Sequence, residues 1–244
     1  MDAAEYALMD TAEDRMWWYR ALRARIVAAL ASRPGANGPV LDAGCGTGGM
    51  VATLLAAGLT RPIIAFDYVV EAARRAAAKT GLPIAVSDIT RQPFPDASFG
   101  AAISLDVLGH RSLQPADALA ELHRVLAPGG TLILNLPAFE WLKSAHDERV
   151  HNARRFSAPS IRALLNTAGF TRIDARYWNA LLLPLMIIQR KIRARDKERA
   201  SDVAPFPPWL DATFHGVTVL EHWLARRGLS YPAGGSVLVV ATRP

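Results

Sequence analysis

Val40-Leu41-Asp42-Ala43-Gly44-Cys45-Gly46-Thr47-Gly48-Gly49-Met50 is the stretch that decides the fold of this chain. An apolar start, typical of a strand, runs into a turn with four glycines in six residues, and an apolar pattern of helical spacing resumes at Met50. Glycine has no Cβ and tolerates positive φ, so the backbone of such a turn can approach a ligand closely. The following helix presents free N–H groups at its positive end. The stretch therefore predicts a strand, a loop and a helix that suit a nucleotide-like ligand.

The spacing of these glycines fits two patterns. Gly44, Gly46 and Gly49 satisfy GxGxxG, which is typical of dinucleotide binding, whereas Gly44, Gly46 and Gly48 satisfy GxGxG. The loop alone leaves the ligand open, and residues further along the chain are needed to decide.

Length and composition favour one α/β domain with additions. The chain has 244 residues, of which 51% are hydrophobic, and this excludes a disordered protein. No stretch approaches the roughly 20 apolar residues that span a bilayer, and no apolar run precedes Trp17, so we expect a cytoplasmic protein. The single cysteine, Cys45, permits no internal disulfide and no cysteine metal cluster. We therefore expect no metal and no redox chemistry.

The net charge of +6 is concentrated in one region. Residues 149–199 hold 12 Lys or Arg and 3 Asp or Glu, which leaves the rest of the chain with a net negative charge. These basic residues lie beside an apolar run instead of alternating with exposed aromatic residues, so the pattern disfavours nucleic acid as a partner.

A carboxylate ends the second predicted strand. Ile63-Ile64-Ala65-Phe66-Asp67 places an acid 23 residues after Gly44, where a carboxylate commonly accepts hydrogen bonds from both hydroxyls of a ribose. The alternative is that Asp67 caps the helix predicted over 69–79.

The remaining elements alternate between strand and helix. We expect strands over 82–87, 99–105, 131–136, 170–177 and 236–243, and helices over 115–126 and 158–168. Such alternation predicts a parallel sheet with helices on both faces, whose ligands bind outside the carboxyl ends of the strands. Asp42, Asp67, Asp88 and residues 105–110 should therefore meet in one crevice.

Several motifs together resemble a known family, the class I S-adenosylmethionine-dependent methyltransferases. The match covers residues 38–137 in the right order and spacing. The motifs are Leu41-Asp42-Ala43-Gly44-Cys45-Gly46-Thr47-Gly48, Phe66-Asp67, Ser87-Asp88-Ile89, Pro93-Phe94-Pro95-Asp96-Ala97-Ser98-Phe99, Leu105-Asp106-Val107-Leu108-Gly109-His110 and Leu122-His123-Arg124-Val125-Leu126-Ala127-Pro128-Gly129-Gly130. A dehydrogenase would explain the glycine loop and Asp67 but gives no role to Asp88-Ile89 or to the Pro-Gly-Gly turn.

The resemblance implies a fold, a reaction and a cofactor site. It implies a Rossmann-like sheet of order 3-2-1-4-5-7-6 with the last strand antiparallel, and methyl transfer from S-adenosylmethionine, with S-adenosylhomocysteine as product. In this family the glycine loop lies against the methionine part of the cofactor, the acid after the second strand holds the ribose, and the next acidic pair reads the adenine. The positions so implied are Asp42, Gly44, Gly46, Gly48, Asp67, Tyr68, Asp88, Ile89 and Leu105, with Tyr19 from the N-terminal arm. The alternative function is a SAM-binding sensor or assembly protein without activity.

Three histidines are the predicted general bases. His146, our first choice, and His151 lie in the segment after the fifth strand, and His110 follows the fourth. A histidine of near-neutral pKa suits an acceptor with a hydroxyl group, so we expect O-methylation of a small molecule. Asp147, beside His146, would orient or stabilise an imidazolium.

This segment also resembles a bacterial subset of the family. Members of that subset carry a double Trp in an N-terminal arm, as in Trp17-Trp18-Tyr19, preceded by a His where this chain has Met16.

Two additions flank the predicted core. Residues 1–37 form an N-terminal helical arm, with an amphipathic helix over 5–31, and the domain over 38–244 includes a substrate-side insertion over 178–232. In that insertion an apolar run over 180–188 precedes a cationic stretch over 189–199. Such a segment can lie on an anionic membrane surface, so we expect a hydrophobic or lipid-like acceptor and weak vesicle binding that depends on Arg190, Lys191, Arg193, Arg195 and Lys197. The alternatives are a lid, or packing against the sheet or a dimer partner.

Overall fold

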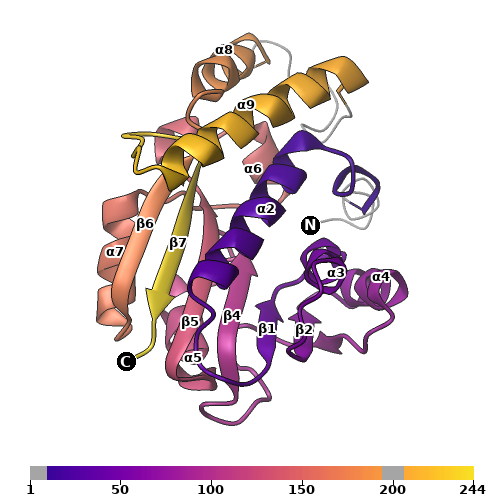
Figure 1. Ribbon diagram of the computed structural model, residues 1–244, viewed down its shortest axis with the longest axis vertical. Helices are drawn as coiled ribbons and strands as arrows, with labels where there is room; N and C mark the ends of the chain where they lie inside the picture. The colour runs from indigo at the N-terminus through magenta and orange to yellow at the C-terminus, as the bar shows by residue number, and fades with distance from the viewer. Residues whose placement is uncertain (1–9, 194–205) are drawn as a thin grey trace.

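A single seven-stranded sheet forms the centre of the computed structural model, which describes residues 10–193 and 206–244 (Figure 1). Its strands are β1 (Val40–Ala43), β2 (Ile63–Asp67), β3 (Ala85–Val86), β4 (Phe99–Leu105), β5 (Leu126–Pro137), β6 (Thr171–Trp178) and β7 (Ser236–Thr242). The order is β3-β2-β1-β4-β5-β7-β6, and β7 runs antiparallel to both of its neighbours. This is the fold class that the sequence predicted.

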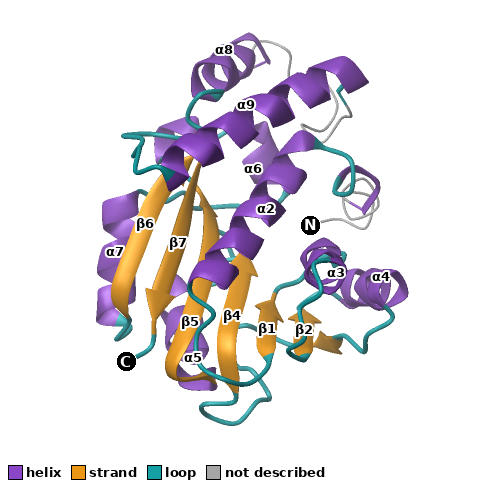
Figure 2. Ribbon diagram, viewed as in Figure 1, coloured by secondary structure: helices purple, strands orange, loops and turns teal. Residues whose placement is uncertain are grey.

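Helices cover both faces of the sheet (Figure 2). They are α2 (Trp17–Ser32), α3 (Gly49–Ala56), α4 (Val70–Thr80), α5 (Pro115–Val125), α6 (Ala145–Arg149), α7 (Ala158–Thr167), α8 (Leu183–Arg193) and α9 (Pro208–Arg226), with a short 3-10 turn over Glu140–Leu142. Successive strand residues point to opposite faces. In β5, Ile133 packs with α2 and α3, while Leu132 and Leu134 pack with α5 and α7. Two apolar layers therefore hold the strand ends in place.

The boundaries differ from expectation at both edges of the core. The third strand, expected over 82–87, is limited to Ala85 and Val86, although the Ser87 amide still donates a hydrogen bond to the Asp67 carbonyl at 3.1 Å. Pro83 has no N–H to donate, which favours a late start of this edge strand. The fifth strand begins earlier than expected, at Leu126, whose Cα is registered with Phe99 before a shift in the pairing.

The N-terminal arm is interrupted before its double tryptophan. A turn at residues 13–15 separates the first helical residues from α2, whereas the sequence predicted one helix over 5–31. Tyr6 and Met9, which that prediction included, lie outside the described residues.

The insertion over 178–232 forms α8 and α9, and a buried ion pair ties it to the arm. Arg25 of α2 contacts Glu221 of α9 at 3.3 Å, and its guanidinium lies over the ring of Trp178, 4.6 Å from the centroid. Burial lowers the pKa of Arg25, and the Glu221 carboxylate opposes that shift. In the described ranges, no helix combines the length and hydrophobicity needed to cross a membrane.

Candidate active site

A cavity of about 770 Å³ opens at the carboxyl ends of the parallel strands. Eleven of the predicted site residues line it: Tyr19, Asp42, Gly44, Gly46, Asp67, Tyr68, Asp88, Ile89, Leu105, His110 and His151. The carboxyl ends of the parallel strands bring most of these residues together, as the sequence predicted, while Tyr19 comes from α2 and His151 follows α6. Aromatic and aliphatic side chains of the arm and the insertion complete the wall, among them Trp17, Trp18 and Met186.

The glycine loop needs glycine for two different reasons. A Cβ on Gly44, whose φ is +83°, would lie 2.5 Å from the Val107 side chain, so this glycine lets the loop approach the segment after β4. Gly48, with φ of +86°, does not line the cavity. A Cβ there would lie 2.9 Å from the Cα and Cβ of Ala76, so Gly48 allows close packing against α4. Gly48 thus has a packing role, and its contact with a ligand stays a prediction.

Asp67 braces the loop. Its carboxylate accepts hydrogen bonds from the amides of Gly46 and Val69, both at 2.9 Å, and only 8% of its surface is exposed. Burial raises the pKa of Asp67, and the amide hydrogen bonds oppose the shift. Asp67 lies two residues before the N-cap Val69, and α4 has no side-chain cap hydrogen bond, so Asp67 does not cap the helix. The carboxylate lines the cavity, and its contact with a ribose stays a prediction.

Asp42 is a buried carboxylate with an unpaired oxygen. It lies on β1 with 1% of its surface exposed, and its Oδ2 accepts no hydrogen bond from the described residues. Burial, together with the carboxylates of Asp67 and Glu13, raises its pKa to about 7. An unpaired carboxylate in a cavity wall is costly unless a cation or a donor lies beside it. An ammonium group of a ligand would supply such a cation.

Asp88 and Ile89 form the third side of the predicted cofactor site. The Oδ1 atom of Asp88 accepts hydrogen bonds from the amide and the hydroxyl of Thr90, both at 2.8 Å, while the Ile89 side chain is buried. The turn holds the Asp88 carboxylate at the cavity rim.

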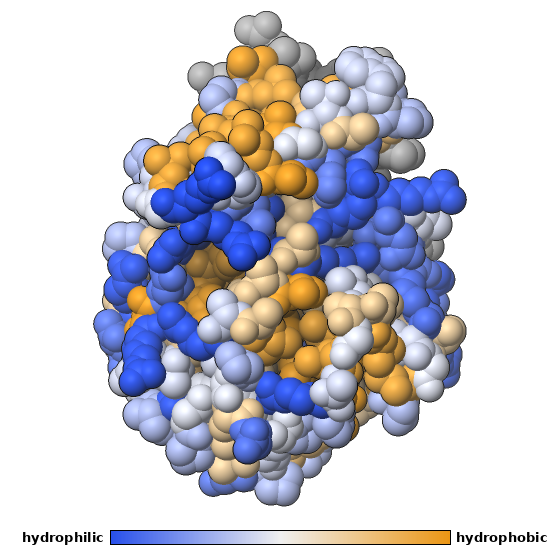
Figure 3. Space-filling model, in the orientation of Figure 1, coloured by the Kyte–Doolittle hydropathy of each residue, from blue (hydrophilic) through white to orange (hydrophobic). Residues whose placement is uncertain are grey.

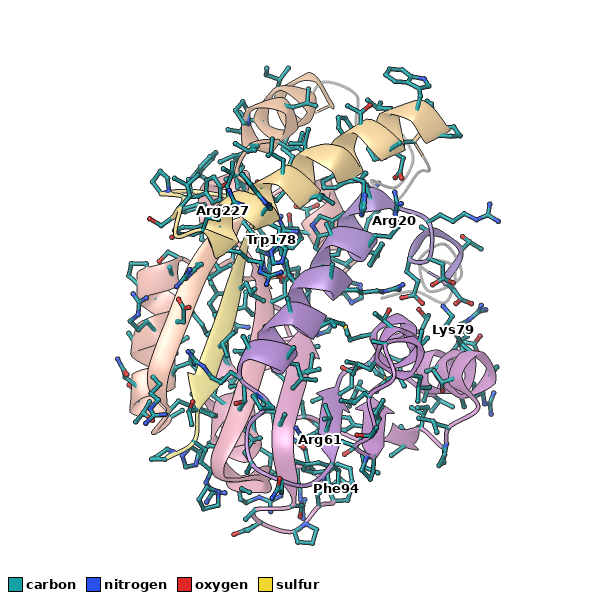
Figure 4. The ribbon with its side chains drawn as sticks, in the orientation of Figure 1. Arg20, Arg61, Lys79, Phe94, Trp178 and Arg227 are labelled. Atoms are coloured by element: carbon teal, nitrogen blue, oxygen red, sulfur yellow. The ribbon has the colours of Figure 1, made fainter. Side chains whose placement is uncertain are left out.

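Sequence reasoning missed the contact between the arm and the glycine loop. Glu13 is buried, and its carboxylate accepts a hydrogen bond from the Thr47 hydroxyl at 2.6 Å and pairs with Arg23 at 2.9 Å. Lys79 of α4 reaches the same carboxylate and also contacts Asp10 at 2.6 Å (Figure 4). We call Glu13, Arg23, Thr47 and Lys79 the arm clasp. No local periodicity signals it, because its members lie far apart in the sequence.

Two of the three histidines predicted as bases, His110 and His151, line the cavity. The rings of His110 and His151 lie 5.8 Å apart, and Nδ1 of His110 is 2.8 Å from the Ser112 hydroxyl. Burial, and the neighbouring His151, lower the pKa of His110. His146 belongs to α6, but its side chain lies outside what the structure describes.

Asp147 accepts hydrogen bonds from several donors of its own segment. Its two oxygens accept hydrogen bonds from Arg155, at 3.0 and 2.9 Å, and from Asn152 and the Ser144 amide, both at 2.8 Å. Although burial opposes the shift, Arg155 and these donors lower its pKa. Asp147 is thus the centre of a hydrogen-bonded loop, and its predicted interaction with His146 stays untested because that side chain lies outside the described part of the structure.

Asp106 belongs to the range 105–110 expected at the crevice, but the sequence did not single it out as a site residue. It follows β4 with φ of +58°, and both of its carboxylate oxygens accept hydrogen bonds from the Asn135 amide group at 3.0 Å. Asp106 is exposed to the cavity, and the cavity walls that surround its carboxylate raise its pKa to about 7. The Trp178 indole donates to the Asn135 carbonyl at 2.8 Å and fixes the orientation of that amide. Its position directly after a buried strand, like that of Asp67, was the available signal.

The cavity is acidic although the chain is basic. Six carboxylates and two guanidinium groups lie among its described lining residues, so the formal charge there is −4 with neutral histidines. Such a lining favours cationic ligands.

Comparison with known proteins agrees with this geometry. Residues 41–134 match the family model described as a methyltransferase domain. The 24-methylenesterol C-methyltransferase 2 of Oryza sativa subsp. japonica is 30% identical over 153 residues, covering 57% of this chain and 40% of that protein. The demethylmenaquinone methyltransferase of Clavibacter sepedonicus is 30% identical over 131 residues, covering 52% and 49%. The aligned part of this chain thus spans less than half the length of these relatives.

Solved structures share the fold over almost the whole chain. A methyltransferase from Thermotoga maritima, described as a possible histamine N-methyltransferase, has a TM-score of 0.61 at 18% identity and covers 99% of this chain and 96% of its own. A complex between the Haloferax volcanii Trm112 activator and a putative methyltransferase gives the same TM-score at 23% identity, with the same coverage. The glycine loop, the acids at the strand ends and the sheet order agree with these matches, and residues 41–134 form a methyltransferase domain of the class I S-adenosylmethionine-dependent type.

Proposed function

We propose that this protein transfers a methyl group from S-adenosylmethionine to a hydroxyl group of a small apolar molecule. The observation that carries the proposal is the unpaired Asp42 carboxylate, which faces the same cavity as Asp67 and Asp88. A cofactor with an ammonium group, a ribose and an adenine presents one partner for each of these three carboxylates.

Each residue on the cofactor side of the cavity would contact one part of the cofactor. Asp42 would pair with the ammonium group, and Asp67, already oriented by the Gly46 amide, would accept from the ribose hydroxyls. Asp88 and the Ile89 amide would read the adenine. Tyr68, Leu105 and Tyr19 would pack around it.

The acceptor side would be formed by the arm and the insertion. Residues 1–37 and 178–232 contribute Trp17, Trp18 and Met186 to the wall, which favours an apolar acceptor. The bound sulfonium supplies an activated methyl group, so the chain has mainly to align the acceptor and remove its proton.

Asp106 suits the proton-accepting role. With a pKa near 7 it is ionised in about half of the molecules at neutral pH, and the Asn135 amide holds both of its oxygens in place. His110 and His151 remain the predicted alternatives, since both face the same cavity.

An amine acceptor is a second candidate function. The formal charge of the lining favours an ammonium group, and Asp106 would bind that group and take its proton before methyl transfer. N-methylation therefore uses the same residues with a different acceptor atom.

Calorimetry and a labelled-cofactor screen test the proposal. We expect S-adenosylmethionine and S-adenosylhomocysteine each to bind at one site per chain. Methyl-labelled cofactor should then label an apolar phenol or amine in a panel of small molecules. If neither cofactor form bound, the proposal would be contradicted. Binding without transfer of label to any molecule of the panel would favour a sensor.

A further inference from the structure

The outer side of α9 is apolar along its whole length. Trp209, Val219, Leu220 and Trp223 are exposed by 70%, 54%, 51% and 46%, at spacings that place them on one side of a helix. Thr218 and Glu221 are buried on the side that faces the domain. No acidic side chain is among the exposed residues of α9, which is described throughout. An apolar helix side that none of the residues in 10–193 and 206–244 covers indicates an interaction surface.

The segment that starts α8 extends this surface. Leu181, Leu185 and Ile188 are exposed by 43%, 46% and 54%, whereas Leu182 and Leu183 are buried. Glu221 of α9 accepts hydrogen bonds from the amides of Ala180 at 2.7 Å and Leu181 at 3.0 Å, so the two helices meet at this point. Hydrophobic residues gather over this end of the molecule in Figure 3. We call Leu181, Leu185, Ile188, Trp209, Val219, Leu220 and Trp223 the α8–α9 face.

Positive charge borders the α8–α9 face. Arg226 and Arg227 are exposed at the end of α9, and the Arg227 guanidinium lies over the Trp223 ring, 3.8 Å from its centroid (Figure 4). The sequence of α8 contains Arg190, Lys191 and Arg193 and no acid. Apolar residues bordered by cations, with tryptophans near both ends of α9, suit the boundary between acyl chains and anionic head groups.

We propose that the α8–α9 face docks on an anionic lipid surface. A second copy of the chain is a poorer partner, because a twofold contact through this face would bring Arg226 and Arg227 close to their own counterparts. No exposed acid on α9 would pair with them. Anionic lipid supplies the complementary charge. Binding would be peripheral and sensitive to salt.

The same elements separate this face from the cavity. Met186 of α8 lines the cavity between Leu185 and Ile188, which are exposed. Phe214 of α9 contacts the rings of Trp17 and Phe206, which both line the cavity. Docking would place the acceptor side of the cavity next to the lipid, from which an apolar acceptor would enter. This last step rests on the proposed function, whereas docking itself does not.

Vesicle co-sedimentation of the full chain tests the docking. We expect binding to phosphatidylcholine vesicles with about 30% phosphatidylglycerol at about 0.05 M NaCl, and its loss at about 0.5 M NaCl or on pure phosphatidylcholine. The double variant Trp209→Ser/Trp223→Ser should reduce the partition coefficient about tenfold or more, because two interfacial aromatic anchors are removed. Neutralising Arg190, Lys191 and Arg193 to Gln should reduce it to a similar extent.

A control variant tests whether vesicle binding depends on this surface or on exposed tryptophans in general. Trp141 is 61% exposed in the turn after β5, so Trp141→Ser removes an equally exposed tryptophan elsewhere and should leave vesicle binding unchanged. Absence of wild-type binding, or equal loss in the Trp141 variant, would overturn the proposal. A dimer in light scattering that Trp209→Ser/Trp223→Ser converts to monomer would also overturn it. Cofactor titration of each variant shows separately whether the methyltransferase site is intact.

Discussion

The Thr47 hydroxyl donates a 2.6 Å hydrogen bond to the Glu13 carboxylate, and this bond joins the N-terminal segment to the glycine loop. Glu13 also lines the cavity, so the segment that it anchors is part of the cavity wall. The clasp places a carboxylate, two cations and a hydroxyl around the start of α3. Any movement of the arm during cofactor exchange has to break these contacts.

Glu13→Gln should therefore accelerate release of bound S-adenosylhomocysteine. The substitution keeps the size of the side chain but removes the charge that pairs with Arg23 and Lys79, and a loss of roughly 1.4 kcal/mol would raise the dissociation rate about tenfold. Stopped-flow displacement measures this rate. Asp14→Asn is the control, since Asp14 is 57% exposed and contacts the same cations at 3.3 and 3.8 Å. Equal rates in the two variants would show that the clasp does not retain the ligand.

Two glycine-to-alanine substitutions should change the stability of the protein in opposite directions. A Cβ on Gly49 would lie 1.9 Å from Arg23 Nη2 and 2.3 Å from Glu13 Oε2, whereas a Cβ on Gly216 would meet no atom within 4 Å. Gly216→Ala should stabilise α9 by about 0.5–1 kcal/mol through helix propensity. Gly49→Ala should displace the Arg23–Glu13 pair and destabilise the protein by roughly 1–3 kcal/mol. Urea unfolding of both variants checks this, and a stable Gly49→Ala protein with normal cofactor affinity would contradict it.

The sheet was predictable because its signals are local. Glycines after a strand, acids at strand ends and alternation of strand and helix are each read within a few residues, and Asp42, Asp67 and Asp88 were placed correctly at the cavity on that basis. Glu13 was missed because its partners lie 34 and 66 residues away in the sequence.

The sequence also did not show which side of α9 faces outward. The spacing of Trp209, Val219 and Trp223 is the same as that of a helix side packed on a core, and only the tertiary arrangement shows which side is open. The interruption of the arm before Trp17 also depends on long-range contacts, since Asp211 of α9 accepts a hydrogen bond from the Trp17 amide at 2.7 Å and thereby satisfies the first turn of α2.

Asp42 should couple cofactor binding to proton release. Its pKa of about 7 means that it is mostly protonated at pH 6 in the free protein, and a bound ammonium group favours the ionised form. We expect up to one proton to be released per bound S-adenosylhomocysteine at about pH 6, and very little at about pH 9. Calorimetry in buffers of different ionisation enthalpy measures this number, and Asp42→Asn should abolish the release and weaken binding. An unchanged proton count in Asp42→Asn would assign the release to another group.

Asp42→Asn should also change the pH dependence of folding stability. Because the pKa of Asp42 is raised from 3.8 to about 7, the folded state retains a proton that the unfolded chain has lost between pH 4 and 7, and stability falls as pH rises through that window. The variant should flatten this slope and gain roughly 2–4 kcal/mol at about pH 8 in the free protein. Urea unfolding at a series of pH values measures the slope, and identical curves for both proteins would contradict the assignment.

Asp106→Asn should separate chemistry from cofactor binding. The substitution keeps the shape of the side chain but removes the proton acceptor, so kcat with the acceptor found in the screen should fall by about 10² to 10⁴, with the affinity for S-adenosylhomocysteine within about twofold. In the wild type, kcat should rise with pH through about 7 as Asp106 ionises, and this rise should be absent from the variant. His110→Gln and His151→Gln are the comparison variants, because both side chains face the same cavity. If Asp106→Asn kept the wild-type rate and pH profile while a histidine variant lost them, the proton would pass to that histidine, and the Asn135–Asp106 contact would be structural.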